Sequence, residues 1–160
     1  MEDAASSPGG EHVEAFVVSL VKSAVGRVAA DVPGLNMSEA DVSACVSAQL
    51  REMGLRVEEQ FPVVPSWTTE GGASVALHAR RADLAVWHGR DAVLVLVELK
   101  VVSTGVEGRF LQQAAAYARA QGCRCVLAVV QKTRTALPAF REFTAEPGQS
   151  APSPQPGGGK

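Results

Sequence analysis

Three charged side chains, Asp83, Glu98 and Lys100, lie in or beside the most apolar part of the sequence. The stretch is RRADLAVWHGRDAVLVLVELK, and its apolar run from Ala92 to Val97 ends directly at Glu98. Burying a charge is costly unless the charge is paired, so these residues require an explanation. Two carboxylates on neighbouring strands could supply the hard oxygen ligands that Mg²⁺ prefers, and a lysine beside them would be a compact cationic donor.

The pairing of the two strands decides whether these side chains meet. The sequence HGRD between them is typical of a turn, and a loop of two or four residues centred on it places Asp83 opposite Leu96. Glu98 is then the diagonal neighbour of Asp83, at roughly 7 Å. Because side chains alternate along a strand, we expect Asp83, Glu98 and Lys100 on one face, whereas a three-residue loop would break this relation.

A first helix is predicted ahead of this hairpin, because apolar residues recur at steps of three and four. Its apolar stripe consists of Val13, Phe16, Leu20, Ala24 and Val28. The sequence VPGLN then ends the helix. Residues 1–10 and the Pro- and Gly-rich residues 144–160 are expected to be disordered, which leaves one domain over residues 11–143.

A second helix is predicted to begin near Asn36, as its N-cap, and to end at Gly54. Glu39 would occupy the third helical position, where its side chain could bond back to the cap. Glu39 also lies three residues before Val42, in line with the apolar stripe of the helix. The alternative is therefore a carboxylate aimed towards the core at the end of the helix.

The remaining elements predict one mixed sheet. LRVEEQFPVV is typical of a strand, and Pro62 indicates an edge position, with a loop PSWTTEGGA before the hairpin. The sequence TGVEGRFLQQAAAYARAQG predicts a helix ended by Gly122, with an inward stripe that contains Gln113 and Tyr117. Gln113 could instead be a polar residue that still reaches water. CRCVLAVV is a further buried strand, parallel to the one before the helix. We therefore expect an α/β protein with an αβββαβ core and a mixed central sheet flanked by helices.

Composition and charge bound the environment. No apolar run is long enough to span a bilayer, and the acidic start does not resemble a signal peptide, so we expect an intracellular protein with no membrane partner. Residues 1–71 hold four basic and eleven acidic residues, whereas residues 72–135 hold nine basic and four acidic. The basic half could face a phosphate backbone, or its charges could be ordinary solvated ones.

Asp83 followed by Glu98-Leu99-Lys100, in adjacent strands of such a core, resembles the PD-(D/E)xK nuclease superfamily. The pattern from Gln113 to Tyr117 is similar to the Q-x-x-x-Y motif of its exonuclease-like branch. More narrowly, NMSEADVSACVSAQLREMGLRVEEQFPV resembles the GxxExxY family, with Glu39 at the family's Glu. Asn36 and Val42 stand where that family has Gly and Tyr.

The resemblance implies a restriction-endonuclease-like fold and a nuclease that hydrolyses nucleic-acid phosphodiester bonds with Mg²⁺ or Mn²⁺. It implies Asp83 and Glu98 as metal ligands, Lys100 as the catalytic cation and Glu39 as a carboxylate that completes the metal shell. Gln113 and Tyr117 would hold a phosphate or the lysine. The implied partner is nucleic acid, DNA in preference to RNA.

Two other classes stay open. One is a catalytically silent module on the same fold that binds nucleic acid or protein. The other is an unrelated Mg²⁺ enzyme acting on nucleotides, although the sequence has no P-loop.

Overall fold

A computed structural model describes residues 8–64, 66–76, 79–89, 95–105 and 107–145. Its centre is a five-stranded sheet in the order β1-β4-β5-β6-β7. These strands are β1 (Arg56–Val63), β4 (Arg80–Trp87), β5 (Val95–Val102), β6 (Arg124–Gln131) and β7 (Ala139–Phe143). β5 and β6 are parallel and the other neighbours antiparallel, so the sheet is mixed. The predicted α/β class, with a mixed sheet flanked by helices, is confirmed.

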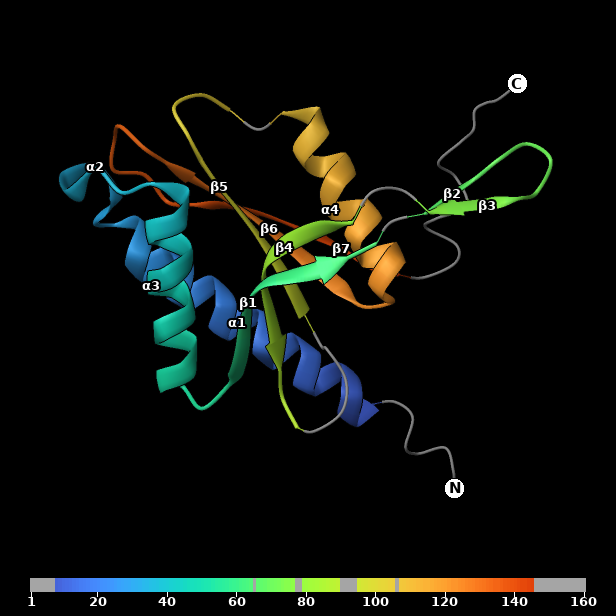
Figure 1. Cartoon of the computed structure of the whole chain (residues 1–160). Coiled ribbons are helices and arrows are strands. Elements are labelled where there is room, and N and C mark those ends of the chain that lie inside the picture. The colour runs from blue at the N-terminus through green and yellow to red at the C-terminus, as the bar shows by residue number, and fades with distance from the viewer. Residues whose placement is uncertain (1–7, 65, 77–78, 90–94, 106, 146–160) are drawn as a thin grey trace.

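Helices cover both faces of the sheet (Figure 1). α1 (Pro8–Ala29), the short α2 (Val32–Leu35) and α3 (Glu39–Glu52) pack on one face, and α4 (Gly108–Gln121) packs on the other. The α1–α3 side is almost entirely aliphatic, and each fully buried Val or Leu contributes roughly 1.5–3 kcal/mol to stability. The α4 side contains Phe110 and Tyr117 and also carries the polar residues described below.

α1 differs from the prediction in two respects. It begins at Pro8, so residues 8–10, expected to be disordered, are helical, and residues 1–7 lie outside the described part. Phe16, predicted in the apolar stripe, is 55% exposed. Val17 and Val21 are buried instead, so the buried face of α1 is shifted by one residue from the predicted positions Phe16 and Leu20.

α3 is capped by Ser38 and not by Asn36. The Ser38 hydroxyl accepts a hydrogen bond from the Asp41 amide, and the Asp41 carboxylate accepts one from the Ser38 amide, which together form a capping box. Asn36 instead ends α2 with a left-handed backbone, φ 52°. The predicted capping role of Glu39 is therefore wrong, because Glu39 is the first helical residue.

The hairpin region also differs from the prediction. The stretch expected as one strand from Ser74 to Trp87 is divided, and its first part, β3 (Ser74–Ala76), pairs with β2 (Ser66–Thr68) in the segment expected as a loop. Strand β7 was not predicted. β1 is an edge strand, as Pro62 indicated.

α4 and its two flanking strands agree with the prediction. The parallel pairing of β5 and β6 confirms the strand–helix–strand unit. Gly122 ends the helix with a left-handed φ of 72°, a conformation that a residue without a Cβ adopts at little cost. The predicted helix begins at Thr104, whereas α4 begins at Gly108, and Val106 lies outside the described residues. No helix in the described part of the chain has the length and hydropathy needed to cross a membrane.

Candidate active site

Asp83 and Glu98 meet where the ladder between β4 and β5 opens. The backbone pairs run from Val86↔Val95 to Leu84↔Val97 and end there, and the next residues, Asp83 and Glu98, are linked by hydrogen bonds through their side chains. This register is shifted by two residues from the predicted one, with Glu98 in the place expected for Leu96. The shift preserves the expected face, because two is the period of a strand.

Side chains replace the backbone ladder at this point. The Asp83 amide donates to Glu98 Oε1 at 3.3 Å, and the Leu99 amide donates to Asp83 Oδ2 at 2.7 Å. Each carboxylate thus accepts a hydrogen bond from the opposite strand. The two acidic groups are held close together by the backbone they displace.

Strand β4 loses its regular alternation around Asp83. Ala82 and Ala85 both pack on the α4 side of the sheet, whereas Leu84 packs on the α1–α3 side. In a regular strand Ala82 and Leu84 would share a face. The irregularity at Asp83 is the local feature that turns its carboxylate into the opened ladder.

Gln60 of β1 lies opposite this irregularity. Its neighbours Glu59 and Phe61 pair with Leu84 and Ala82, the two residues on either side of Asp83. The Gln60 backbone has a φ of 56°, and a non-glycine residue in this region costs of order 1–3 kcal/mol. The Gln60 side chain acts as a hydrogen-bond donor to Asp83 and lowers its pKa. The strain at Gln60 therefore coincides with a contact to a site carboxylate.

Glu98 is the most buried charged residue of the described chain, at 3% exposure. Burial and the negative charge of Asp83 raise the pKa of Glu98 to about 7. The positive charge of Lys100, whose Nζ lies 3.5 Å from Glu98 Oε2, lowers this pKa but does not offset the rise. Burial also raises the pKa of Asp83, opposed by the Leu99 amide, and the charge of Glu39 raises it further. One lysine does not balance these carboxylates.

Glu39 approaches the site from α3. Its Oε2 accepts a hydrogen bond from the Val101 amide at 3.2 Å, next to Lys100 on β5. Its charge is felt at Asp83. Glu39 is exposed, so it is not aimed into the core as one alternative predicted, but its hydrogen bond places the carboxylate at the end of β5.

Gln113 and Tyr117 face the strands from α4. Gln113 Nε2 donates to the Tyr117 hydroxyl at 2.9 Å, and the phenol is 1% exposed. Burial and the charge of Glu98 raise the pKa of Tyr117 to about 12, so the hydroxyl stays protonated. Phe110, one turn earlier, has Lys100 Nζ at 5.1 Å and Arg109 Cζ at 5.3 Å from its ring centroid.

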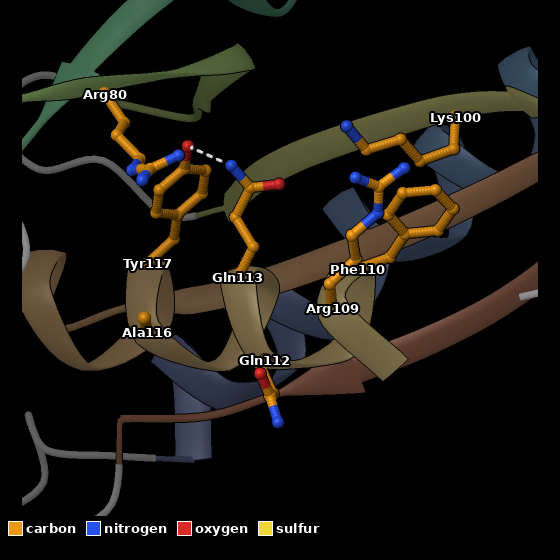
Figure 2. A pocket seen from close by; sticks show the side chains of 8 residues that line it. All are labelled: Arg80, Lys100, Arg109, Phe110, Gln112, Gln113, Ala116 and Tyr117. Carbon is orange, nitrogen blue, oxygen red and sulfur yellow. Dashed lines mark hydrogen bonds between the residues drawn. The ribbon is translucent and has the colours of Figure 1, made fainter. Parts of the chain in front are cut away.

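A cavity of about 590 Å³ lies between α4 and the strands (Figure 2). Its described lining combines three basic residues with neutral polar, aromatic and apolar ones and includes no acidic residue: Arg80, Lys100, Arg109, Phe110, Gln112, Gln113, Ala116 and Tyr117. Three predicted site residues, Lys100, Gln113 and Tyr117, thus share one cavity. Asp83, Glu98 and Glu39 do not line it; Glu98 adjoins it through Lys100.

Asp83 and Glu98 fit a divalent cation. Within the described residues no three His, Cys, Asp or Glu side chains are arranged to hold a metal ion, so Glu39 does not form a three-carboxylate group with Asp83 and Glu98. Mg²⁺ is commonly held by one or two carboxylates, with waters and substrate phosphate as the other ligands. Burial raises both pKa values, the charge of Asp83 raises that of Glu98 and the charge of Glu39 raises that of Asp83, and a bound dication would relieve this repulsion.

Sequence reasoning did not identify Gln60, Arg80 or Arg109 as members of this region. Arg80 was available as a charge three residues before Asp83, and Arg109 as a charge next to the predicted apolar stripe of α4. Gln60 carried no signal, because its left-handed backbone cannot be recognised from a glutamine in a strand-like sequence.

No protein family matches the sequence, and no curated protein matches it. Among solved structures, the chain is similar to the crystal structure of SSO0001, with 14% identity and a TM-score of 0.38. The match covers 78% of this chain and 65% of that one. This level of similarity adds nothing about function.

Proposed function

We propose that this protein is a metal-dependent nuclease that hydrolyses nucleic-acid phosphodiester bonds. The observation that carries the proposal is the opened ladder, in which Asp83 and Glu98 are linked by hydrogen bonds through their side chains and Glu98 lies 3.5 Å from Lys100. A buried site with more carboxylate than cation is electrostatically unfavourable by itself and suits a bound dication.

Asp83 and Glu98 would hold Mg²⁺ or Mn²⁺. When bound, the ion would supply Lewis-acid stabilisation of phosphate charge and a water activated at neutral pH. The protein's own part is to keep both carboxylates in place through the Leu99 and Asp83 amides. Glu39, held by the Val101 amide, adds negative charge near Asp83 and favours a cation there.

Lys100 is the proposed electrostatic catalyst. Its ammonium adjoins both Glu98 and the cavity, where it can stabilise charge that develops on the phosphate oxygens. Gln113 and Tyr117 supply neutral donors on the same wall, and the protonated phenol can donate to a phosphate oxygen. The basic lining suits the phosphate backbone of a nucleic acid.

One observation favours a second candidate, a silent nucleic-acid-binding module. Neither Asp83 nor Glu98 lines the cavity, and burial raises the pKa of Glu98 to about 7, so a substantial fraction of its carboxyl groups is protonated at neutral pH. A module that only binds nucleic acid would use the basic cavity and need no metal.

Two measurements separate these functions. The first is calorimetric titration of Mg²⁺ and Mn²⁺ into wild type and Asp83→Ala. The second is cleavage of single- and double-stranded DNA and RNA at low salt, with and without chelator, by both proteins and by Lys100→Ala. We expect metal binding that Asp83→Ala abolishes, and cleavage that chelator and either substitution abolish or strongly reduce.

Equal residual cleavage by wild type and both variants would identify a contaminant and favour the silent module. Metal binding by Asp83→Ala with wild-type affinity would show that this carboxylate is not a ligand, and would overturn the proposed site.

A further inference from the structure

The cavity has two cationic ends. Lys100 and Arg109 lie at one end, both over the ring of Phe110, and Arg80 lies at the other, beside Tyr117 (Figure 2). Phe110 and Tyr117 are seven positions apart on α4, which corresponds to about 10 Å along the helix axis. This separation is more than a single phosphate group can bridge.

The cations at the two ends have different partners. Lys100 is paired with Glu98, and Arg109 with Glu107 at 2.7 Å. Arg80 has no ion pair or hydrogen bond to another described residue, and its guanidinium is the one cavity cation without a carboxylate neighbour among them. Among the described residues, no carboxylate competes with an anionic ligand for its charge.

Neutral donors lie between the two ends. Gln113 is one helical turn from both Phe110 and Tyr117, and it donates one of its two amide hydrogens to the Tyr117 hydroxyl. The second amide hydrogen and the phenolic hydrogen remain available. The cavity therefore has a cation at each end and neutral hydrogen-bond donors between them. This arrangement suits a ligand with repeated negative charges and polar groups between those charges.

We propose that Arg80 forms a second phosphate subsite, which binds the backbone phosphate next to the one at Lys100. This inference rests on the proposed function and gives it a substrate class: nucleic-acid strands with at least two consecutive phosphates, in preference to isolated phosphodiesters. Arg80 then contributes to substrate binding and not to the chemical step.

The test compares wild type, Arg80→Ala, Arg80→Lys and Arg81→Ala. Arg81 is the matched control, because it is the next residue of β4, is also exposed and does not line the cavity. Binding of a short oligonucleotide is measured over a range of salt concentrations. Hydrolysis of the same oligonucleotide and of bis(para-nitrophenyl) phosphate, which has a single phosphate, is measured with Mn²⁺.

We expect Arg80→Ala to weaken oligonucleotide binding about five- to tenfold and to reduce the salt dependence by about one phosphate contact. Hydrolysis of the small diester should stay within about twofold of wild type. Arg80→Lys should restore most of the salt dependence, and Arg81→Ala should resemble wild type.

The subsite is overturned if the wild type binds the oligonucleotide and Arg80→Ala matches it, or if Arg80→Ala and Arg81→Ala lose affinity equally. A wild type that hydrolyses neither substrate but binds the oligonucleotide through Arg80 would refute the nuclease and retain the subsite. A wild type that does not bind the oligonucleotide would refute both.

Discussion

Two clusters of charged side chains in this protein differ in how far their positive charges balance their negative ones. In the first, Glu14 and Glu142 pair with Lys22 and Arg124, and the three ion pairs have lengths of 2.7–3.0 Å. In the second, Glu98 pairs with Lys100 at 3.5 Å, and Asp83 has no ion pair to another described residue. The first cluster, which ties α1 to β6 and β7, is neutral, and the second carries excess negative charge.

The acidic groups respond in opposite directions. A hydrogen bond from Lys22 lowers the pKa of Glu142, whereas burial raises the pKa of Glu98 to about 7. Glu142 favours its charged form, so its contribution to stability is present above its unfolded pKa of 4.5 and is lost as the pH falls through its lowered folded pKa. The unbalanced cluster disfavours its charged form, which is costly for folding and suits a cation-binding site.

Replacing the lysine of each cluster should separate activity from stability. Lys100→Ala should reduce phosphodiester cleavage at least about a hundredfold, the size expected when one electrostatic donor to the transition state is lost. Lys22→Ala should leave cleavage unchanged and lower the free energy of unfolding by no more than about 1 kcal/mol, since its ion pair is partly exposed. Turnover rates and urea unfolding of the two variants check this.

Metal affinity gives Lys100→Ala a second readout. Removing a positive charge beside the site should leave Mg²⁺ affinity intact or improve it. A loss of Mg²⁺ affinity in Lys100→Ala would mean that the lysine maintains the site's structure, and the comparison of the two clusters would fail.

Replacing one carboxylate of each cluster should change stability in opposite directions. At pH 8 without metal, Glu98→Gln should raise the free energy of unfolding by roughly 1–3 kcal/mol, because it removes a buried charge whose pKa is raised from 4.5 to about 7. Glu142→Gln should lower it slightly. Denaturant unfolding of both variants at pH 5 and pH 8 is the measurement.

The pH dependence has a defined sign. Folded Glu98 holds its proton more tightly than the unfolded chain does, so its contribution to stability is full below about pH 4.5 and is lost as pH rises to about 7. Glu98→Gln should remove this decline. A variant that is less stable than wild type at pH 8 would show that the ionised Glu98 is well satisfied without a metal.

Mg²⁺ should reverse the electrostatic cost of the second cluster. Wild type at pH 8 should gain about 1–2 kcal/mol of stability at a Mg²⁺ concentration some tenfold above its dissociation constant. The gain should shrink towards pH 5, where Glu98 is protonated, and should be absent in Asp83→Ala. Thermal melts with and without Mg²⁺ test this, and an equal gain in Asp83→Ala would indicate nonspecific ion binding.

The core of the fold could be predicted from the sequence because its signals are local. Periods of two and of three to four residues, with Gly122 ending α4, identify α3, β1, β4, β5, α4 and β6 as one αβββαβ order. The short β2 and β3 and the edge strand β7 have weak patterns and depend on partners distant in sequence. Ser38 and Asn36 are both good caps, and tertiary packing of α2 decided between them.

The residues of the candidate site likewise fall into those that local sequence patterns predict and those that depend on tertiary packing. Glu98 and Lys100 could be placed on one face because a strand alternates, and the error in register of two residues kept Asp83 near Glu98, but the loss of alternation in β4 at Asp83 could not be predicted. Arg80 becomes part of the cavity only through the packing of α4 on the sheet. Gln60 depends on a backbone distortion in a strand whose sequence shows no sign of it.

Gln60 offers the smallest and most selective test. Both Gln60→Gly and Gln60→Ala remove the amide that contacts Asp83, and both should weaken Mg²⁺ binding and cleavage a few-fold. Their stabilities should differ by about 1 kcal/mol in favour of glycine, which adopts the left-handed backbone without strain, whereas alanine keeps the strain of glutamine. Calorimetric Mg²⁺ titration and urea unfolding of the pair measure the two effects. If both variants bind Mg²⁺ as wild type does, Gln60 does not position Asp83, and its strained backbone belongs to the folding of the edge strand alone.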